Sequence, residues 1–256
     1  MHEVVGEVIA TRHPDVPVGQ RVVGWAMGFN AIADLVICDG EGLSTYPPSF
    51  ALASAVLLQS LACVLYAVHR LPPVTGRSVA VIGQGPMGCL FTQVLKAQGA
   101  RHVVAIDPVD RSDIATAMGA DEVVTANSSR WVASLREHDR PDVVVEAVGH
   151  QVSTLSHALR SVAFGGTVYY FGVPDDPVYP IDVEVMLRRN ITLMSGATTE
   201  RRRFLGLANA HLAAHPQLAD ALVNDVLAFE DAQVAFELAD RPAAGRLKVA
   251  LTRRRA

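Results

Sequence analysis

From residue 78 onward, short apolar runs alternate along the chain with segments of helical length. The runs are rich in β-branched residues and mostly uninterrupted by polar ones, which is typical of strands buried on both faces of a parallel sheet. They lie at 79–82, 102–106, 122–124, 143–145, 167–171 and 191–194. The helical segments lie at about 86–98, 110–118, 128–137, 151–161 and 182–188. Because crossovers between parallel strands are right-handed, this order predicts a doubly wound α/β fold.

The first 70 residues have a different pattern, with short strands at 4–10, 21–24 and 31–37 that are separated by turns containing Pro and Gly. They predict a small β-rich unit. The apolar stretch at 50–68 contains Gln59 and several small residues, so we interpret it as a buried amphipathic helix and not as a membrane span. Helices near 199–214 and 231–239 and a last strand near 246–251 complete the predicted elements.

The composition is that of a globular protein. Of the 256 residues, 50% are hydrophobic and 19% are charged, which favours one large domain or two unequal ones and excludes a disordered chain. A net charge of −4 indicates neither a nucleic-acid nor a membrane partner, and the arginines at 253–255 are interpreted as a solvated tail. Three scattered cysteines and an N-terminus without a secretory pattern predict free thiols and a cytoplasmic protein.

One motif carries recognisable chemistry, Gly83-Gln84-Gly85-Pro86-Met87-Gly88. It follows the strand at 79–82 and opens the helix at 86–98, and G-x-G-x-x-G in that position is typical of dinucleotide binding. Gly83 permits a tight turn, Gly85 lets the backbone approach a pyrophosphate, and Gly88 lets the helix pack on the strand. The free N–H groups and the dipole at the helix start attract the phosphates. All six residues are therefore candidate cofactor contacts.

Asp107 ends the strand at 102–106 and indicates which nicotinamide cofactor the motif binds. A carboxylate in this position can accept hydrogen bonds from both ribose hydroxyls of NAD, and it repels the 2′-phosphate of NADP. The alternative is an Asp that only caps a helix beside a glycine-rich turn. Arg111 is a candidate contact on the adenine side, although a surface charge is the simpler interpretation. The sequence therefore predicts an NAD(H) site.

These motifs resemble the medium-chain dehydrogenase/reductase family, in its zinc alcohol, polyol and threonine dehydrogenase branch. Besides the glycine motif, the resemblance rests on Met118-Gly119-Ala120-Asp121, Val144-Val145-Glu146-Ala147-Val148-Gly149, Gly165-Gly166-Thr167-Val168 and His2-Glu3-Val4-Val5-Gly6-Glu7-Val8. It implies a Rossmann sheet plus a partial, β-rich GroES-like catalytic domain, with the active site in the cleft between them. We expect a truncated GroES-like domain at 1–48, the Rossmann NAD-binding domain at 49–197, and at 198–256 its end and the return to the catalytic domain.

The resemblance also implies several site residues. Val148, Gly149, Phe171 and Val173 would lie along the nicotinamide side of the cofactor. Lys248 would lie near the pyrophosphate, or would merely flank the last strand. His2 would lie at the active site, and Glu3 would support a metal site from behind.

The zinc site of this branch is incomplete in the sequence. The branch holds one zinc with Cys, His and a third Cys, Asp or Glu, and the metal polarises the substrate oxygen. The Cys ligand would lie before His2, so the chain resembles an N-terminally shortened member. Gln59 stands where a Glu ligand is expected, and a neutral amide is a poorer zinc ligand. Cys63, one helical turn further on, is either a substitute ligand or a small buried residue. The run at 25–30 replaces the structural-zinc lobe.

Two explanations of these departures stay open. The chain starts inside a longer protein, or it is a naturally shortened member that works without zinc; Gln59 favours the second because it does not depend on where the chain starts. Without zinc, a side chain must polarise or protonate the substrate oxygen. The candidates are His2, Tyr66 and His69, and the resemblance favours His2. We therefore predict no bound metal and regard zinc as doubtful.

The leading hypothesis is an NAD(H)-dependent oxidoreductase that transfers hydride to or from a small carbonyl, alcohol or activated alkene. The alternatives are a zinc-dependent alcohol or polyol dehydrogenase whose chain starts late, an epimerase or cyclase that uses bound NAD(H) transiently, and a non-catalytic NAD(H)-binding protein. The segment at 167–180 resembles the region through which family dimers join their sheets, so we expect a homodimer.

Overall fold

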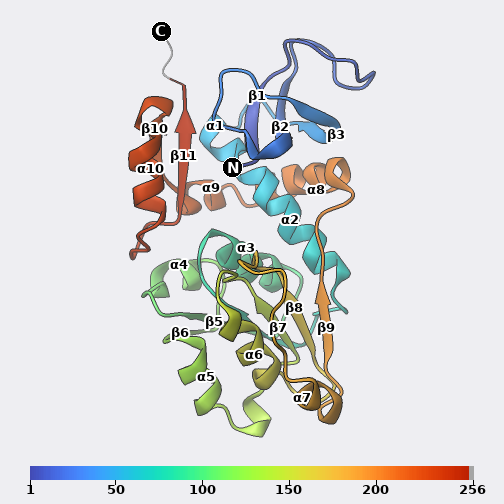
Figure 1. Ribbon diagram of the computed structural model, residues 1–256, viewed down its shortest axis with the longest axis vertical. Helices are drawn as coiled ribbons and strands as arrows, with labels where there is room; N and C mark the ends of the chain where they lie inside the picture. The colour runs from blue at the N-terminus through green and yellow to red at the C-terminus, as the bar shows by residue number, and fades with distance from the viewer. Residues whose placement is uncertain (254–256) are drawn as a thin grey trace. The chain divides into compact units, whose positions relative to one another are not determined.

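A computed structural model describes residues 1–253 of the chain, so Arg254 and Arg255 of the expected solvated tail lie outside the described residues. The chain forms two compact units (Figure 1). Unit 1 comprises Met1–Tyr66, Thr198–Pro242 and the described residues from Arg246 on; unit 2 comprises Ala67–Ala197 and Ala243–Gly245. Most of the segment 198–256 thus groups with the first 66 residues. The three predicted domains themselves stay a prediction.

Unit 2 is built on a six-stranded parallel sheet with the strand order β6-β5-β4-β7-β8-β9. This order confirms the predicted doubly wound α/β fold. The strands are β4 Ser78–Ile82, β5 His102–Asp107, β6 Glu122–Thr125, β7 Val143–Glu146, β8 Thr167–Tyr170 and β9 Thr192–Ser195. They lie within a few residues of the predicted runs, because continuous apolar strands are easy to recognise.

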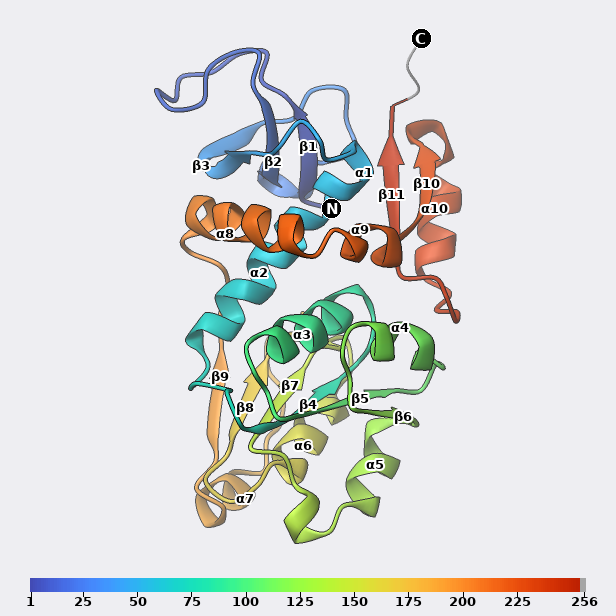
Figure 2. The same cartoon turned by 180° about the vertical axis from the view of Figure 1, so that it is seen from behind.

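Helices cover both faces of this sheet, with α3 and α4 on one side and α5 and α6 on the other (Figure 2). The helices are α3 Pro86–Ala97, α4 Ser112–Ala117, α5 Ser128–Ser134, α6 Val152–Ser161 and α7 Val183–Arg188, with the 3-10 turn η2 at Glu137–Asp139. Ile82 and Val144 pack with Trp131 of α5 and Leu159 of α6 in one core layer. The carboxyl ends of β4, β5 and β7 remain uncovered by these helices and carry the glycine-rich motif and its neighbours.

Unit 1 contains a three-stranded antiparallel sheet, a two-stranded parallel sheet and several helices. The strands are β1 Glu3–Glu7, β2 Arg21–Ala26, β3 Cys38–Thr45, β10 Val223–Ala228 and β11 Lys248–Thr252. The helices are α1 Leu52–Ala55, α2 Leu57–Arg70 (which continues into unit 2 from Ala67 on), α8 Arg201–Ala214, α9 Gln217–Leu222 and α10 Ala232–Ala239, with 3-10 turns η1 at Met27–Phe29 and η3 at Phe229–Asp231. The three-stranded sheet of β1, β2 and β3 confirms the small β-rich unit that was expected in the first 70 residues.

One predicted strand in unit 1 needs correction, and two of its elements were not predicted. The strand expected at 31–37 is wrong, because the chain there makes turns and the strand that pairs with β2 is β3. The sequence of β3, Cys-Asp-Gly-Glu-Gly-Leu-Ser-Thr, has few apolar residues, and its pairing with β2 stabilises an extended conformation that its own pattern does not favour. α9 and β10 were not predicted, and β10 likewise depends on a distant strand, β11.

The segment Leu52–Arg70 is long and apolar enough to cross a membrane by length and composition, with a mean hydropathy of 1.8. Such a test is also passed by the core helix of a globular protein. Here 56% of the tested window is buried, and Leu57, Leu58 and Leu61 have no exposed surface. The helix therefore has the packing of a core element, as the interpretation of 50–68 anticipated.

Candidate active site

The glycine-rich motif forms a tight turn between β4 and α3 whose three glycines have different surroundings. Gly83 has a φ of +92°, a conformation that side chains disfavour, and a Cβ on Gly88 would lie 1.8 Å from the carbonyl oxygen of Gly83. Gly85 has an ordinary φ of −70°, and a Cβ there would meet no atom within 4 Å. Two glycines are thus required by the fold itself, whereas Gly85 borders open space. A ligand can approach the backbone at that point.

Helix α3 begins at Pro86, the first residue after this open position. Proline suits the first helical position because it has no N–H to leave without a partner. Met87 and Gly88 follow in the first turn, where backbone N–H groups have no partner within the helix. The turn therefore combines an accessible backbone with the positive end of a helix, which is an arrangement that binds anions.

Gln84 and Asp107 are held close to each other beside the turn. The Asp107 carboxylate accepts hydrogen bonds from the backbone N–H of Gln84 at 2.6 Å and of Val109 at 2.8 Å. The Gln84 side chain is fully buried; it accepts a bond from Thr92 and donates one to Val81. Asp107 is thus fixed next to the turn with lone pairs remaining, while the side chain and the backbone N–H of Gln84 are already hydrogen bonded within the protein.

Arg111 does not behave as the surface charge that the simpler interpretation expected, and that interpretation is wrong. It is 5% exposed, and its Nη1 donates a hydrogen bond of 2.5 Å to the carbonyl oxygen of Ala243. The residues Ala243–Gly245 belong to unit 2 although the chain around them belongs to unit 1. Arg111 therefore anchors this short segment to the rest of unit 2.

The loops that follow β7 and β8 are pressed together at Gly149 and Gly172. Gly149 has a φ of +60°, and a Cβ on Gly172 would lie 2.0 Å from the nitrogen of Gly149. A Cβ on Gly149 would lie 2.5 Å from the nitrogen of Val173. Phe171 packs edge-on against Phe91 of α3 with 4.8 Å between ring centroids. The structure thus brings together the four residues predicted along the nicotinamide, Val148, Gly149, Phe171 and Val173.

Glu146, which the sequence analysis did not select, organises these two loops. Its carboxylate is fully buried and accepts hydrogen bonds from the backbone N–H groups of Val148 at 3.1 Å and Gly149 at 3.2 Å. Burial raises the pKa of Glu146, which Thr154 and the backbone donors only partly offset. The signal in the sequence was an acid at the end of an otherwise apolar strand, where a buried charge requires a local role.

The candidate catalytic residues lie in unit 1 around a second carboxylate, that of Glu3, whose side chain is 25% exposed. Its Oε2 is 2.6 Å from Nζ of Lys248, and its Oε1 accepts a hydrogen bond from the hydroxyl of Ser60. Lys248 also donates to Ser60 at 3.2 Å. Burial acts to raise the pKa of Glu3, but Lys248 and Ser60 outweigh burial and the pKa lies below its ordinary value. The ammonium group of Lys248 therefore forms an ion pair with Glu3. Ser60 also belongs to this cluster, although the sequence analysis did not identify it.

Gln59 and Cys63 lie beside this cluster. The Gln59 amide is satisfied when its oxygen accepts from Trp25 Nε1 at 2.6 Å and its nitrogen donates to Glu3 at 3.2 Å. Cys63 Sγ lies 3.2 Å from a terminal amide atom of Gln59, and burial raises the pKa of its thiol to about 11. Within residues 1–253, no group of three or more His, Cys, Asp and Glu side chains could hold a metal ion.

His2 and Tyr66 complete the candidate catalytic residues, and they have different neighbours. The His2 ring packs edge-on against Phe29 at 5.5 Å, and burial lowers the pKa of the imidazole despite the nearby Glu3. The Tyr66 hydroxyl is hydrogen bonded to Thr199 at 3.1 Å, and its ring packs on Phe204. Imidazole is therefore mostly neutral near pH 7 and can donate a hydrogen bond to an oxygen atom.

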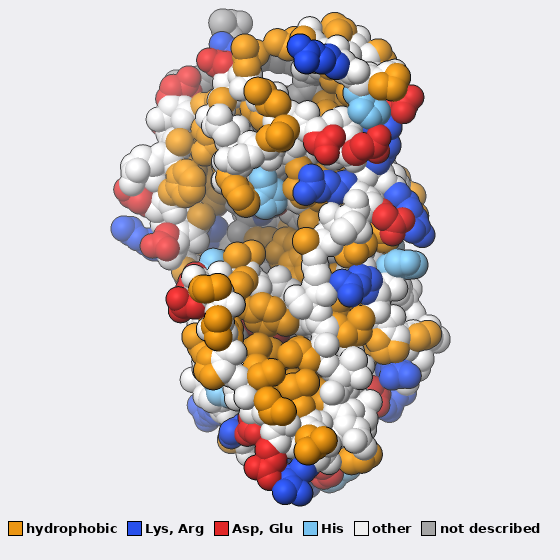
Figure 3. Space-filling model, turned by 45° about the vertical axis from the view of Figure 1, so that its right-hand side comes forward, with side chains coloured by type: hydrophobic (Ala, Val, Ile, Leu, Met, Phe, Trp, Pro, Cys, Tyr) orange, Lys and Arg blue, Asp and Glu red, His pale blue; other side chains and the backbone are white. Residues whose placement is uncertain are grey.

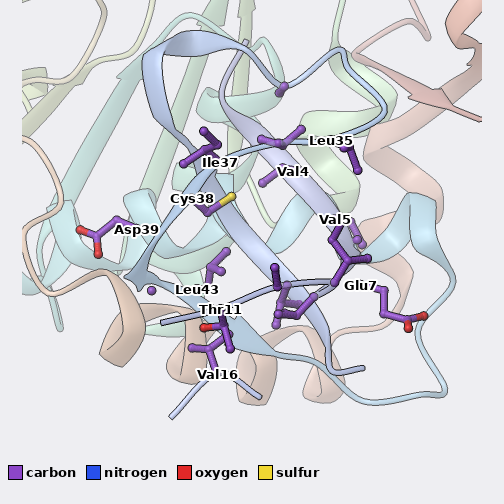
Figure 4. A pocket seen from close by; sticks show the side chains of 18 of the residues that line it. Val4, Val5, Glu7, Thr11, Val16, Leu35, Ile37, Cys38, Asp39 and Leu43 are labelled. Carbon is purple, nitrogen blue, oxygen red and sulfur yellow. The ribbon is translucent and has the colours of Figure 1, made fainter. Parts of the chain in front are cut away.

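Unit 1 also contains a cavity of about 880 Å³ between β1, β3 and the segment that joins β2 to β3. Figure 4 shows apolar side chains such as Val4, Leu35 and Ile37 around it, together with the thiol of Cys38. None of the predicted catalytic or cofactor residues lines it. Its chemistry suits apolar contacts and does not add to the candidate active site.

Comparisons with known proteins agree with this picture. The family model described as zinc-binding dehydrogenase matches residues 86–211. An L-threonine 3-dehydrogenase of Bacillus licheniformis is 36% identical over 107 residues, which are 40% of this chain and 31% of that protein. A Mycobacterium tuberculosis protein named "Probable zinc-binding alcohol dehydrogenase" is 34% identical over 188 residues, which are 72% of this chain and 48% of that protein. The chain thus matches less than half the length of either relative.

Among solved structures, the alcohol dehydrogenase TADH of Thermus sp. ATN1 has a TM-score of 0.81 and 27% sequence identity. The match covers 98% of this chain and 83% of that one, so it includes both units. The glycine turn, the parallel sheet and these relatives point to one group of proteins. The chain belongs to the medium-chain dehydrogenase/reductase family, in its zinc alcohol dehydrogenase-like branch.

Proposed function

We propose that this protein is an NAD(H)-dependent oxidoreductase that transfers hydride to or from a small carbonyl, alcohol or activated alkene. One observation carries the proposal: Gly85 borders open space at the start of α3, next to the fixed carboxylate of Asp107. The fold itself would accept alanine at Gly85, because a Cβ there meets no other atom. A glycine in this position is therefore better explained by a ligand that approaches the backbone. When bound, the nicotinamide cofactor supplies the hydride chemistry, and the protein supplies position and electrostatics.

The residues of unit 2 fit such a cofactor. Backbone N–H groups at the start of α3 would hold the pyrophosphate, with Gly85 allowing its approach. Asp107 would accept hydrogen bonds from the adenosine ribose, and its negative charge favours NAD(H) over NADP(H). The loops that Glu146 holds, at Val148–Gly149 and at 171–173, would contact the nicotinamide.

For the substrate oxygen, we propose polarisation by a side chain of this chain, with His2 as the donor. The donor set at the expected zinc position is a poor one, since Gln59 is a neutral amide already bonded to Trp25 and Glu3. Glu3 itself is neutralised by Lys248. Metal analysis of the purified protein tests this part. About one tightly bound zinc per chain, whose removal abolishes activity, would favour the zinc-dependent alcohol or polyol dehydrogenase instead.

The cofactor proposal is tested by titrating the protein with NADH and with NADPH and following nucleotide fluorescence. We expect saturable NADH binding that is at least about tenfold tighter than NADPH binding, because Asp107 repels a 2′-phosphate. Tighter NADPH binding would refute the NAD(H) assignment. Deuteride transfer from labelled NADH to a panel of carbonyl compounds then tests the reaction. Exchange of deuterium without net cofactor turnover would indicate the epimerase or cyclase, and binding without any transfer a non-catalytic protein.

We further propose a cytosolic homodimer that forms through unit 2. β9 is an edge strand of the six-stranded sheet, and edge strands require cover. Apolar side chains are exposed nearby at Val173, Val178, Val183 and Leu187, and hydrophobic side chains gather on the lower part of the face drawn in Figure 3. Light scattering after size-exclusion chromatography measures the mass directly. A mass of twice 27.4 kDa is expected, and a monomer at micromolar concentration would contradict the proposal.

A further inference from the structure

Three successive arginines begin helix α8, and their side chains have different partners. Arg202 donates to the carbonyl oxygen of Gly40 at 2.7 Å and is 3.4 Å from the Asp15 carboxylate. Arg203 is paired with Glu200 at 2.6 Å on the surface. Arg201 has no hydrogen bond and no ion pair with any residue that the structure describes. A guanidinium carries five N–H donors, so those of Arg201 can form hydrogen bonds with a ligand.

Arg201 is nevertheless held in place. Its guanidinium carbon lies over the ring of Trp25, 5.3 Å from the centroid, which is within the range of a cation–π contact. Its side chain also passes close to the backbone of β3, since a Cβ on Gly42 would lie 3.6 Å from Nη1. The side chain is half-buried and not free in solvent. Little further entropy is lost when such a pre-positioned guanidinium forms hydrogen bonds.

This guanidinium lies next to the candidate catalytic residues of the same unit. Trp25, beneath it, is bonded to Gln59. Arg201 is also close enough to His2 and to Cys63 to act on the charge of each. Burial dominates both shifts: it lowers the pKa of His2 and raises the pKa of Cys63, and the positive charge of Arg201 adds to the first shift and opposes the second. The uncommitted donors of Arg201 therefore belong to the same cluster of side chains as His2 and Gln59.

The charges in this cluster do not balance. Glu3 is the carboxylate of the cluster, and Lys248 already neutralises it at 2.6 Å. Arg201 adds a positive charge with no carboxylate opposite it among residues 1–253. A half-buried positive charge attracts an anion more strongly than an exposed one, because the surrounding dielectric is lower. A neutral alcohol would leave this charge uncompensated, whereas a carboxylate or phosphate would pair with it in a two-pronged geometry.

We propose that Arg201 binds an anionic group of the substrate, so that this enzyme acts on a hydroxy or oxo compound that carries a carboxylate or a phosphate ester. This inference rests on the proposed oxidoreductase function, and it adds the substrate class. The shared chemistry is an oxyanion with at least two acceptor oxygens. The cofactor's own pyrophosphate has the same chemistry, and the experiment separates the two sources.

Trp25 provides a direct readout, because the chain has two tryptophans and the other, Trp131, lies in the core of unit 2. In a Trp131→Phe background, Trp25 emission is titrated with inorganic phosphate and with acetate at constant ionic strength. We expect saturable changes in the millimolar range. Arg201→Gln should weaken phosphate binding by at least about tenfold, as expected when charged hydrogen bonds are lost. Arg203→Gln is the matched control on the same helix, and it should bind phosphate as the parent does.

Calorimetric titration of the unmodified protein with phosphate gives a second measurement if Trp131→Phe perturbs folding. Absence of a saturable response in both measurements would overturn the proposal, as would equal responses in the Arg201 and Arg203 variants. NADH affinity is measured in each variant and should stay within about twofold of the parent value. A tenfold loss in Arg201→Gln alone would assign Arg201 to the cofactor's phosphates and also overturn the proposal. Failure of NADH binding in the unmodified protein would instead refute the proposed function.

Discussion

The open position at Gly85 yields the sharpest prediction, because it separates a ligand-binding role from a folding role within one turn. Gly85→Ala adds a methyl group where no atom lies within 4 Å and where φ is already −70°. Gly88→Ala adds the same group 1.8 Å from the carbonyl oxygen of Gly83. The two substitutions are chemically identical and three residues apart. Because their surroundings differ, Gly85→Ala should weaken cofactor binding and leave stability nearly unchanged, whereas Gly88→Ala should lower stability.

The effect of Gly85→Ala on stability should be small. Alanine reduces the freedom of the unfolded chain, which stabilises by about 0.4–1 kcal/mol, but it is a poorer residue at a helix N-cap by a similar amount. The net change should stay within about 1 kcal/mol, or about 4 °C in Tm for a chain of this size. In Gly88→Ala the new atom meets backbone that cannot rotate away, so we expect a loss of about 3 kcal/mol or more.

The effect of Gly85→Ala on cofactor affinity should be large. The methyl group keeps a phosphate from reaching the backbone N–H groups, and a hydrogen bond to a charged group contributes about 1.5–3 kcal/mol. The loss of one such bond weakens NADH binding by about 10- to 150-fold. Thermal melts give the stability of each variant, and NADH titration gives the affinity. Gly206→Ala, on an exposed position of α8 with open space around it, is the control for glycine replacement as such.

Two results would refute this reasoning. If Gly85→Ala binds NADH within about threefold of the parent, the open backbone does not contact the cofactor. If it melts as low as Gly88→Ala, the turn at Gly85 is a folding requirement and its open space has no bearing on ligand binding.

Asp107→Asn should weaken NADH binding by about tenfold and narrow the preference over NADPH, measured by parallel titrations; an unchanged ratio of the two affinities would show that the carboxylate does not select the cofactor. Lys248→Met should lower the free energy of unfolding by about 2 kcal/mol in urea titrations, because it leaves the half-buried Glu3 carboxylate without its cation. The double variant with Glu3→Gln should recover most of the loss, and additive losses would contradict the pairing. Burial, and then the neighbouring His215, lower the pKa of His211 to about 4. The unfolded chain therefore binds a proton at this residue more readily than the folded protein does. The contribution of His211 to stability is present above pH 6.5 and is lost as the pH falls toward 4. Tm measured from pH 7 to pH 4 should therefore fall less steeply for His211→Gln than for the parent, and parallel curves would contradict the burial of a neutral imidazole.

Unit 2 was predictable from the sequence to a large extent. Its strands are continuous apolar runs, and the motif around Gly85 lies between a strand and a helix that each have a clear pattern of their own. The glycine spacing indicates where the backbone must turn tightly or pack closely. The positive φ of Gly83 and the close packing of Gly88 on the carbonyl oxygen of Gly83 confirm this. Asp107 was found by its position alone. Such features depend on residues close in the sequence, and a pattern can therefore reveal them.

Unit 1 was less predictable because its elements depend on distant partners. The strand β3 has little apolar periodicity and forms by pairing with β2, while β10 forms with β11. In unit 2 as well, Arg111 carries a charge that the sequence assigns to the surface, yet it is 5% exposed and donates a hydrogen bond to Ala243. Neither the pairing of strands nor the burial of a charge can be read from neighbours in the chain.

The parallel sheet, the glycine turn and the acid at the end of β5 follow from local sequence patterns, since short-range sterics and hydrophobic periodicity specify them. Only the tertiary structure decided which charges compensate one another. Glu3 and Lys248 are 245 positions apart and form one ion pair, whereas Arg201, beside the same cluster, has no carboxylate partner among residues 1–253. Electrostatic pairing depends on distances in space, and these arise only when the chain has folded.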